Sequence, residues 1–211
     1  MYAQDPLNAI MVKTGNATER DLFIFGIPSS SFRGYWPSST VNTIPADPPN
    51  TWDFSIVKIH PQSRMGTVTL NSADPRDTPE INFRFFEGPE SDADIAAMSE
   101  GMQLGRSIFD SIPAPLGPFT EVFPCEDRKC DLKQTVLTQA WSHHASSSCA
   151  IGADSDPMAV LDSKFRVRGT TGLRVVDVSA FPRVPGGFPV IPVFMISMKA
   201  SETILQDAKA M

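Results

Sequence analysis

Residues 51–61 read TWDFSIVKIHP, and this stretch decides the fold class. Trp52, Phe54 and Ile56 follow one another at every second position, which predicts a strand with one buried face. Three further short runs have the composition of strands, and turn-forming residues such as DPRDTP separate them. These runs are DLFIFGIP (21–28), TVTLNS (67–72) and EINFRFF (80–86), and together the four predict an antiparallel sheet, whereas residues 1–20 are predicted to be irregular.

Helices are predicted at three places. Apolar residues recur every three or four positions in ESDADIAAMSEGMQLGRSIFDSI (90–112), so they form one face of a helix, and Ser91 with Asp94 resembles a capping box. Shorter or less regular patterns predict helices in 131–141 and 191–211. The run LRVVDV (173–178) reads as a strand buried on both faces. The predicted class is therefore α+β, an antiparallel sheet flanked by helices.

Composition limits the possible partners. The chain has 211 residues, a net charge of -6 and no basic stripe, which argues against nucleic acid. It contains no apolar run of about 20 residues and no secretory signal, so we predict a cytoplasmic protein with no membrane contact. The sequon at Asn16 is accordingly read as a chance match. Free thiols are the preferred state of Cys125 and Cys130, and a local disulfide is the alternative.

Two segments resemble a known family. These are HPQSRMGTVTLNSADPRDTPEINFRFF (60–86) and HHASSSCAIGADSDPMAVLDSKFRVRGTTGLRVVDVSAFPRVPGGFPVIPVFMISMKASETIL (143–205). Both are similar to the C-terminal part of the glucose–methanol–choline (GMC) oxidoreductases, most closely the fungal members. The resemblance implies a single truncated domain over 1–211. Residues 20–140 would be substrate-domain sheet and helices, and 141–211 would be the C-terminal signature segment of the family, in which the LRVVD strand and the last helix return to the FAD lobe.

The chain departs from the family at the cofactor. It contains no GxGxxG turn, the device that holds the FAD pyrophosphate at a helix N-terminus. We therefore expect no bound cofactor, with FAD present only if a separate lobe supplies its site. Asp177 and Ser179 match the family's D-x-S motif near the flavin. Without FAD this motif is vestigial, and Asp177 is expected to cap a turn.

The family register selects the candidate catalytic residues. Counted back from Cys149, the family's substrate-facing histidine corresponds to His144, and His143 is the second candidate. Phe188, or Pro189 in a register shifted by one, occupies the position of a second catalytic His or Asn, and neither can transfer a proton. We read Cys149 as a buried small side chain and His60 as structural, and we expect no metal. The expected apolar substrate pocket comprises Phe32, Tyr35, Trp36, Trp52, Phe54 and Phe188.

Three functions are compatible with this pattern. The first is an FAD-independent, non-redox enzyme in which His144 acts as acid, base or hydrogen-bond group. It would catalyse cyclisation, a pericyclic (Diels–Alder-type) step or dehydration of an apolar secondary-metabolite intermediate. The second is the substrate-binding half of a split FAD-dependent alcohol oxidase or dehydrogenase, and the third is a non-catalytic binding remnant. The expected partners are a small apolar substrate and a second copy in a homodimer, with a compact monomer as the alternative.

Overall fold

The computed structural model describes residues 8–28, 51–142 and 144–210. The chain divides into two compact units, Met1–Trp141 and Ser142–Met211, and each is described by itself. The single truncated domain expected over 1–211, with a change of segment at about residue 140, stays a prediction. The predicted α+β class with antiparallel pairing is confirmed.

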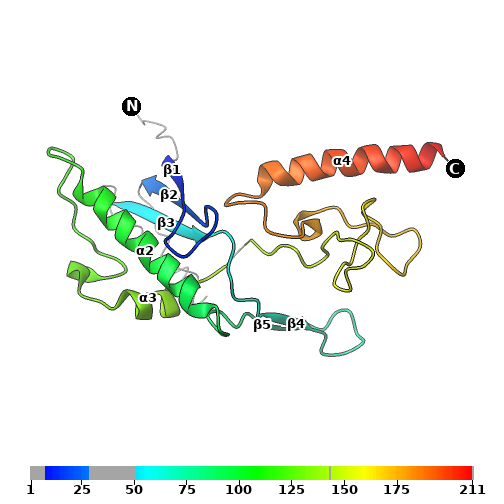
Figure 1. The fold of residues 1–211 in the computed structure, drawn as a ribbon, viewed down its shortest axis with the longest axis horizontal. Helices are drawn as coiled ribbons and strands as arrows, with labels where there is room; N and C mark the ends of the chain where they lie inside the picture. The colour runs from blue at the N-terminus through cyan, green and yellow to red at the C-terminus, as the bar shows by residue number, and fades with distance from the viewer. Residues whose placement is uncertain (1–7, 29–50, 143, 211) are drawn as a thin grey trace. The chain divides into compact units, whose positions relative to one another are not determined.

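Unit 1 is built on a three-stranded antiparallel sheet of order β1-β2-β3 (Figure 1). Its strands are β1 (Asn8–Val12), β2 (Leu22–Pro28) and β3 (Trp52–Lys58). The prediction of an irregular N-terminus was wrong at β1. This five-residue strand is defined by its pairing with β2, in which Ile10 lies opposite Ile24, and so short a run has no clear period of its own. A separate antiparallel pair joins β4 (Thr67–Thr69) to β5 (Glu80–Asn82).

Helix α2 (Ser91–Asp110) packs against β2 and β3 (Figure 1). The close approach depends on Gly101, because a Cβ there would come within 2.9 Å of side-chain carbons of both Leu22 and Ile56. The core forms on this contact, and the shorter helix α3 (Leu132–Gln139) packs on α2. Buried apolar residues of the unit include Leu22, Ile24, Ile59, Ile95 and Val136.

The predicted capping box of α2 was wrong. Glu90 is the N-cap residue and its side chain makes no capping hydrogen bond. Asp94 is instead buried and accepts hydrogen bonds from the backbone N–H groups of Gln62 and Ser63, at 2.9 and 3.0 Å. The carboxylate therefore fixes the loop that follows β3, because a buried charge needs such donors close by.

A second buried carboxylate, Asp21, lies at the start of β2. It accepts hydrogen bonds from the backbone N–H and hydroxyl of Thr14, at 2.8 and 2.7 Å, and Lys58 Nζ lies 2.7 Å away. Burial alone would raise the pKa of Asp21, but the hydrogen bonds from Lys58 and Thr14 and the charge of Lys58 outweigh it. The pKa of this carboxyl is therefore held below its ordinary value.

Cys125 and Cys130 form a disulfide, so the preferred expectation of free thiols was wrong. The short 3-10 turn η1 (Glu126–Arg128) folds the chain back and brings the two Cα atoms to 5.6 Å, within the range that a disulfide can bridge. Cys149 is the free cysteine of the described residues and is half-buried, compared with the buried position expected for it.

Unit 2 has little regular structure apart from one long helix. Its elements are the 3-10 turn η2 (Val178–Ala180) and helix α4 (Val190–Lys209), and its strand-like contacts are isolated bridges such as Arg166 with Arg174. The predicted strand at 173–178 was wrong. Leu173 is 51% exposed and the residues after it are at best half-buried, because no neighbouring strand among the described residues pairs with this segment.

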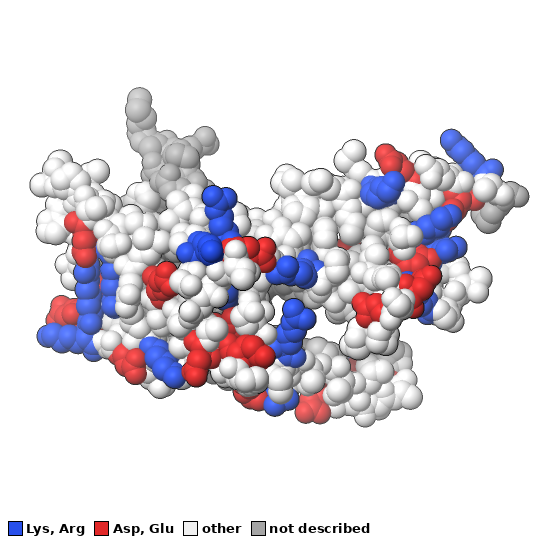
Figure 2. Space-filling model, viewed as in Figure 1, with Lys and Arg blue, Asp and Glu red and all other residues white. Residues whose placement is uncertain are grey.

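Charges of both signs are interspersed on the face shown in Figure 2. The described residues of this face form no basic stripe of the kind that binds phosphates, and the absence of a nucleic-acid partner stays a prediction. None of the helices in the described ranges combines the length and hydropathy that crossing a bilayer requires.

Candidate functional site

The loop that carries His144 is fixed to η2 by backbone hydrogen bonds. The N–H groups of Ser147, Cys149 and Ile151 donate to three successive carbonyl groups of η2, at 3.4, 3.0 and 3.0 Å. These hydrogen bonds join the segment to a turn, so the segment is not a regular β-strand. They nonetheless hold the segment after His144 in one position along the turn.

Asp177 caps η2 and so stabilises the other side of this contact. Its Oδ1 accepts a hydrogen bond of 2.7 Å from the backbone N–H of Ser179. Hydrogen bonds from Ser179 hold the pKa of Asp177 below its ordinary value, because they favour the charged carboxylate. The side chain of Asp177 thus has the capping role predicted for it. A relation of Asp177 or Ser179 to a flavin stays a prediction.

Two of the predicted site residues lie close together in unit 2. The ring centroids of His144 and Phe188 are 6.3 Å apart, and the rings meet edge to face. Phe188 stands immediately before Pro189, the N-cap residue of α4, and is 44% exposed. The family register placed these two positions in one site, and their contact gives an imidazole next to an apolar ring that a ligand can reach.

Ser147 was missed by the sequence reasoning as a candidate polar group. Its hydroxyl is buried and has no hydrogen-bond partner in the part of the chain that the structure describes. Its backbone has a φ of 64°, the left-handed region that non-glycine residues rarely adopt. Such strain often marks functional segments, but a serine in a run of three carries no signal in the sequence.

The other predicted pocket residues fall elsewhere. Trp52 and Phe54 belong to β3 in unit 1, where Trp52 is 41% exposed and the ring of Phe54 lies 4.7 Å from that of Phe109 on α2. Phe32, Tyr35, Trp36 and His143 lie outside the described residues. One pocket that unites these aromatic residues with His144 therefore stays a prediction.

His60 also lies in unit 1, where its Nδ1 is 3.2 Å from a carboxylate oxygen of Glu19. It is part of the loop that follows β3 and is half-buried. This position agrees with the structural role predicted for it, and it makes His60 the natural control for experiments on His144.

The described residues do not fit the pyrophosphate of FAD. A dinucleotide needs a helix N-terminus that carries free N–H groups and no negative charge. Helix α2 has Asp92 and Asp94 in its first turn, and the N-cap Asp131 of α3 already accepts from Lys133 N–H. Helix α4 begins with exposed apolar residues. The helix N-termini among the described residues therefore offer no site for the pyrophosphate of FAD.

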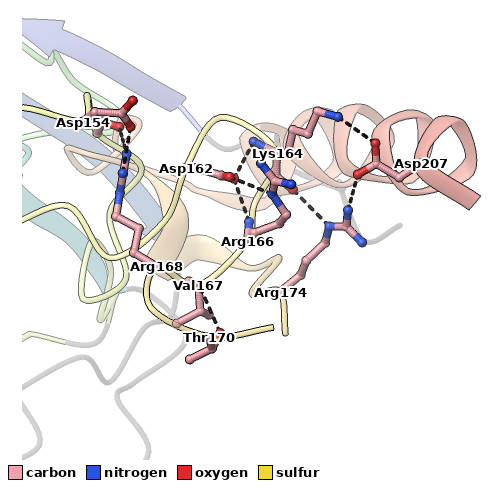
Figure 3. Close-up of polar contacts among 10 residues, drawn as sticks. Asp154, Asp162, Lys164, Arg166, Val167, Arg168, Thr170, Arg174 and Asp207 are labelled. Carbon is pink, nitrogen blue, oxygen red and sulfur yellow. Dashed lines mark hydrogen bonds and ion pairs between the residues drawn. The ribbon is translucent and has the colours of Figure 1, made fainter. Parts of the chain in front are cut away.

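A hollow of about 540 Å³ in unit 2 is lined by Asp154, Asp162, Arg166, Arg168 and the turn 167–172, and His144 is not part of its lining. Its charges are paired with one another. Arg168 binds Asp154 at 2.8 Å and Arg166 binds Asp162 at 2.7 Å (Figure 3). Outside the lining of the hollow, Asp207 of α4 pairs with both Lys164 and Arg174. We interpret this network as a set of contacts that fix the loops of unit 2. No group of three or more potential metal ligands occurs among the described residues.

Comparison with known proteins gives a consistent result. The model of the GMC oxidoreductase family matches residues 61–197. The oxygen-dependent choline dehydrogenase of Vibrio vulnificus is 34% identical over 185 residues, which is 81% of this chain and 32% of that protein. A glucose–methanol–choline oxidoreductase of Aspergillus terreus, atC, is 33% identical over 205 residues, which is 92% of this chain and 32% of that protein.

Solved structures agree with these sequence matches. A crystal structure of formate oxidase superposes with a TM-score of 0.70 at 25% identity, covering 91% of this chain and 32% of the oxidase. The chain thus spans about a third of the length of the proteins that it matches.

Proposed function

The chain belongs to the GMC oxidoreductase family, and we propose that it forms the C-terminal, substrate-facing part of an FAD-dependent alcohol oxidoreductase. In this proposal the flavin is held by protein outside the described residues, whether in the same polypeptide or in another. This is the split-enzyme hypothesis of the sequence analysis in a broader form. The observation that carries it is the contact between Phe188 and His144, whose loop is fixed to η2 by backbone hydrogen bonds.

His144 is the residue that we assign to the proton of the substrate alcohol. Imidazole accepts a proton near neutral pH, and a positioned base of this kind contributes about 10²–10⁴-fold to a rate. The three hydrogen bonds to η2 keep its loop in place before substrate arrives. A fixed base is needed because a small displacement of the acceptor removes the benefit of proximity.

Phe188 makes the proposed site different from a two-base site. Its ring can neither accept nor donate a proton, so His144 acts alone at this position in the proposal. The exposed part of the ring offers an apolar surface for the substituent that the alcohol carries. The substrate class that follows is an alcohol with an apolar or aromatic substituent next to the hydroxyl-bearing carbon.

Helix α4 supports the need for additional protein. Apolar residues follow one stripe of the helix at three- and four-residue spacing, and each is at least 60% exposed. An apolar surface of this kind on a described helix indicates that another part of the protein covers it. The stripe consists of Ile191, Phe194, Met195, Met198 and Leu205.

The FAD-independent cyclase or dehydratase stays a prediction, and no contact among the described residues favours it. Its apolar pocket would need Phe32, Tyr35 and Trp36, which lie outside the described ranges. The non-catalytic remnant and the homodimer also stay predictions, and no contact among the described residues favours them. Of these hypotheses, the alcohol oxidoreductase accounts for both the His144–Phe188 contact and the apolar stripe of α4.

The test compares two histidine variants of the native protein with its flavin bound. We expect His144→Ala to slow the reduction of bound flavin by an alcohol by about 10²–10⁴-fold. The matched control, His60→Ala, removes an imidazole that contacts Glu19 in unit 1 and should leave the rate within about twofold. Equal rates for wild type and His144→Ala would contradict the role of His144.

A further inference from the structure

The turn between β1 and β2 holds an exposed asparagine in a fixed loop. The backbone N–H of Ala17 donates to the carbonyl oxygen of Thr14 at 3.1 Å, which closes a tight turn around Gly15 and Asn16. The N–H of Gly15 donates to a carboxylate oxygen of Glu100 on α2 at 3.0 Å. The loop is thus fixed from both sides while the side chain of Asn16 is exposed.

This asparagine begins the pattern Asn-X-Ser/Thr. Asn16, Ala17 and Thr18 form the only such pattern in the whole sequence, and the middle residue is not proline. Asn16 and Thr18 are both exposed, and the turn lies outside the hydrogen bonds of the sheet. A bulky substituent on Asn16 therefore meets no buried group of unit 1.

A second and independent observation concerns the compartment. Cys125 and Cys130 are joined in a disulfide, and stable disulfides form where thiols are oxidised, as in secretory compartments. Its formation transfers two electrons and two protons from the thiols to a disulfide-bearing thiol oxidase. The expectation of reduced thiols followed from the cytoplasmic location predicted from the sequence, and the disulfide argues against both. The sequon and the disulfide lie far apart in the chain and depend on different chemistry.

We propose that Asn16 is an N-glycosylation site and that the protein matures in an oxidising secretory compartment. The donor is a lipid diphosphate-linked oligosaccharide. The amide nitrogen of Asn16 bonds to the anomeric carbon, and the bond from that carbon to the diphosphate oxygen breaks. The lipid diphosphate leaves with the electron pair, and the amide nitrogen loses one proton to solvent. The inference goes beyond the proposed oxidoreductase function and does not rest on it.

The test uses protein isolated from the organism that makes it. Treatment with peptide-N-glycosidase in heavy-oxygen water converts a glycosylated asparagine into a labelled aspartate, which peptide mass mapping locates. We expect the label at residue 16 and a lower protein mass after treatment. Unreduced digests of the same sample should contain the peptides of Cys125 and Cys130 joined. An unlabelled, unmodified Asn16 would overturn the proposed site, and free thiols at both cysteines would overturn the proposed compartment.

Two variants at one position separate the sequon from the turn. Thr18→Ala removes the hydroxyl that the pattern requires and should abolish the label at residue 16. Thr18→Ser keeps a hydroxyl and should retain it. Because Thr18 is exposed, neither change affects the core of unit 1. Loss of the label in both variants, or its persistence in Thr18→Ala, would contradict the assignment.

Discussion

The two units of this chain bury their apolar residues in different ways. In unit 1, helix α2 lies on a sheet and covers Leu22 and Ile24, which are fully buried. In unit 2, a few buried residues such as Leu161 and Phe165 lie under irregular loops, and α4 presents a stripe of exposed apolar side chains. Unit 1 therefore carries its own core, whereas α4 of unit 2 has an exposed apolar stripe, which we propose further protein covers.

The largest expected effect follows from breaking the buried ion pair of unit 1. Lys58→Met leaves Asp21 as a buried charge without its partner, and we expect a loss of about 3–5 kcal/mol in the free energy of unfolding. Urea unfolding followed by tryptophan fluorescence measures it, because Trp36, Trp52 and Trp141 all precede unit 2 in the sequence. The control Lys129→Met changes a lysine that is 82% exposed and should stay within about 0.5 kcal/mol. Similar losses in both variants would show that Lys58 is not specifically paired.

The next effect compares one apolar side chain from each unit. Leu22→Ala creates a cavity under α2 and should cost about 2–5 kcal/mol in the same measurement. Met198→Ala removes a side chain that is 69% exposed. It should cost less than about 0.5 kcal/mol in the isolated chain, as measured by hydrogen exchange of α4 amides. A large loss for Met198→Ala in this chain alone would mean that the stripe is already covered.

The smallest expected effect is on how the free energy of unfolding depends on acidic pH. The folded-state pKa of Asp21 lies below its unfolded value, so its contribution to stability is complete above the unfolded pKa and is lost as the pH falls through the folded one. We expect the free energy of unfolding to decline as the pH drops below about 5, and the decline should be shallower in Asp21→Asn. Equal slopes in the two proteins, measured by urea unfolding at a series of pH values, would show that Asp21 does not couple to folding.

Local patterns predicted the parts of the fold that depend on local information. The period-two run and the apolar face placed β3 and α2 close to their observed bounds, although the face expected to be buried in β3 is at best half-buried. The prediction was wrong where long-range contacts decide the structure. β1 exists through its pairing with β2, and the segment 173–178 lacks a neighbour among the described residues that would make it a strand.

The candidate site, too, could be predicted from the sequence only in part. The family register placed His144 and Phe188 in one site, and their ring centroids lie 6.3 Å apart, while their roles stay predictions. Composition offered no signal for the buried hydroxyl of Ser147, whose backbone N–H donates to Val178 of η2. The disulfide was also misjudged, since the spacing of Cys125 and Cys130 does not show that the intervening turn brings them together.

The most direct test of the central claim is the visible absorbance of the native protein. It is recorded before and after an alcohol is added in the absence of oxygen. We predict the absorbance bands of bound flavin, and we predict that an alcohol with an aromatic substituent bleaches them. A colourless protein that takes up no FAD, and that converts an apolar polyene without flavin, would contradict the account and support an FAD-independent enzyme.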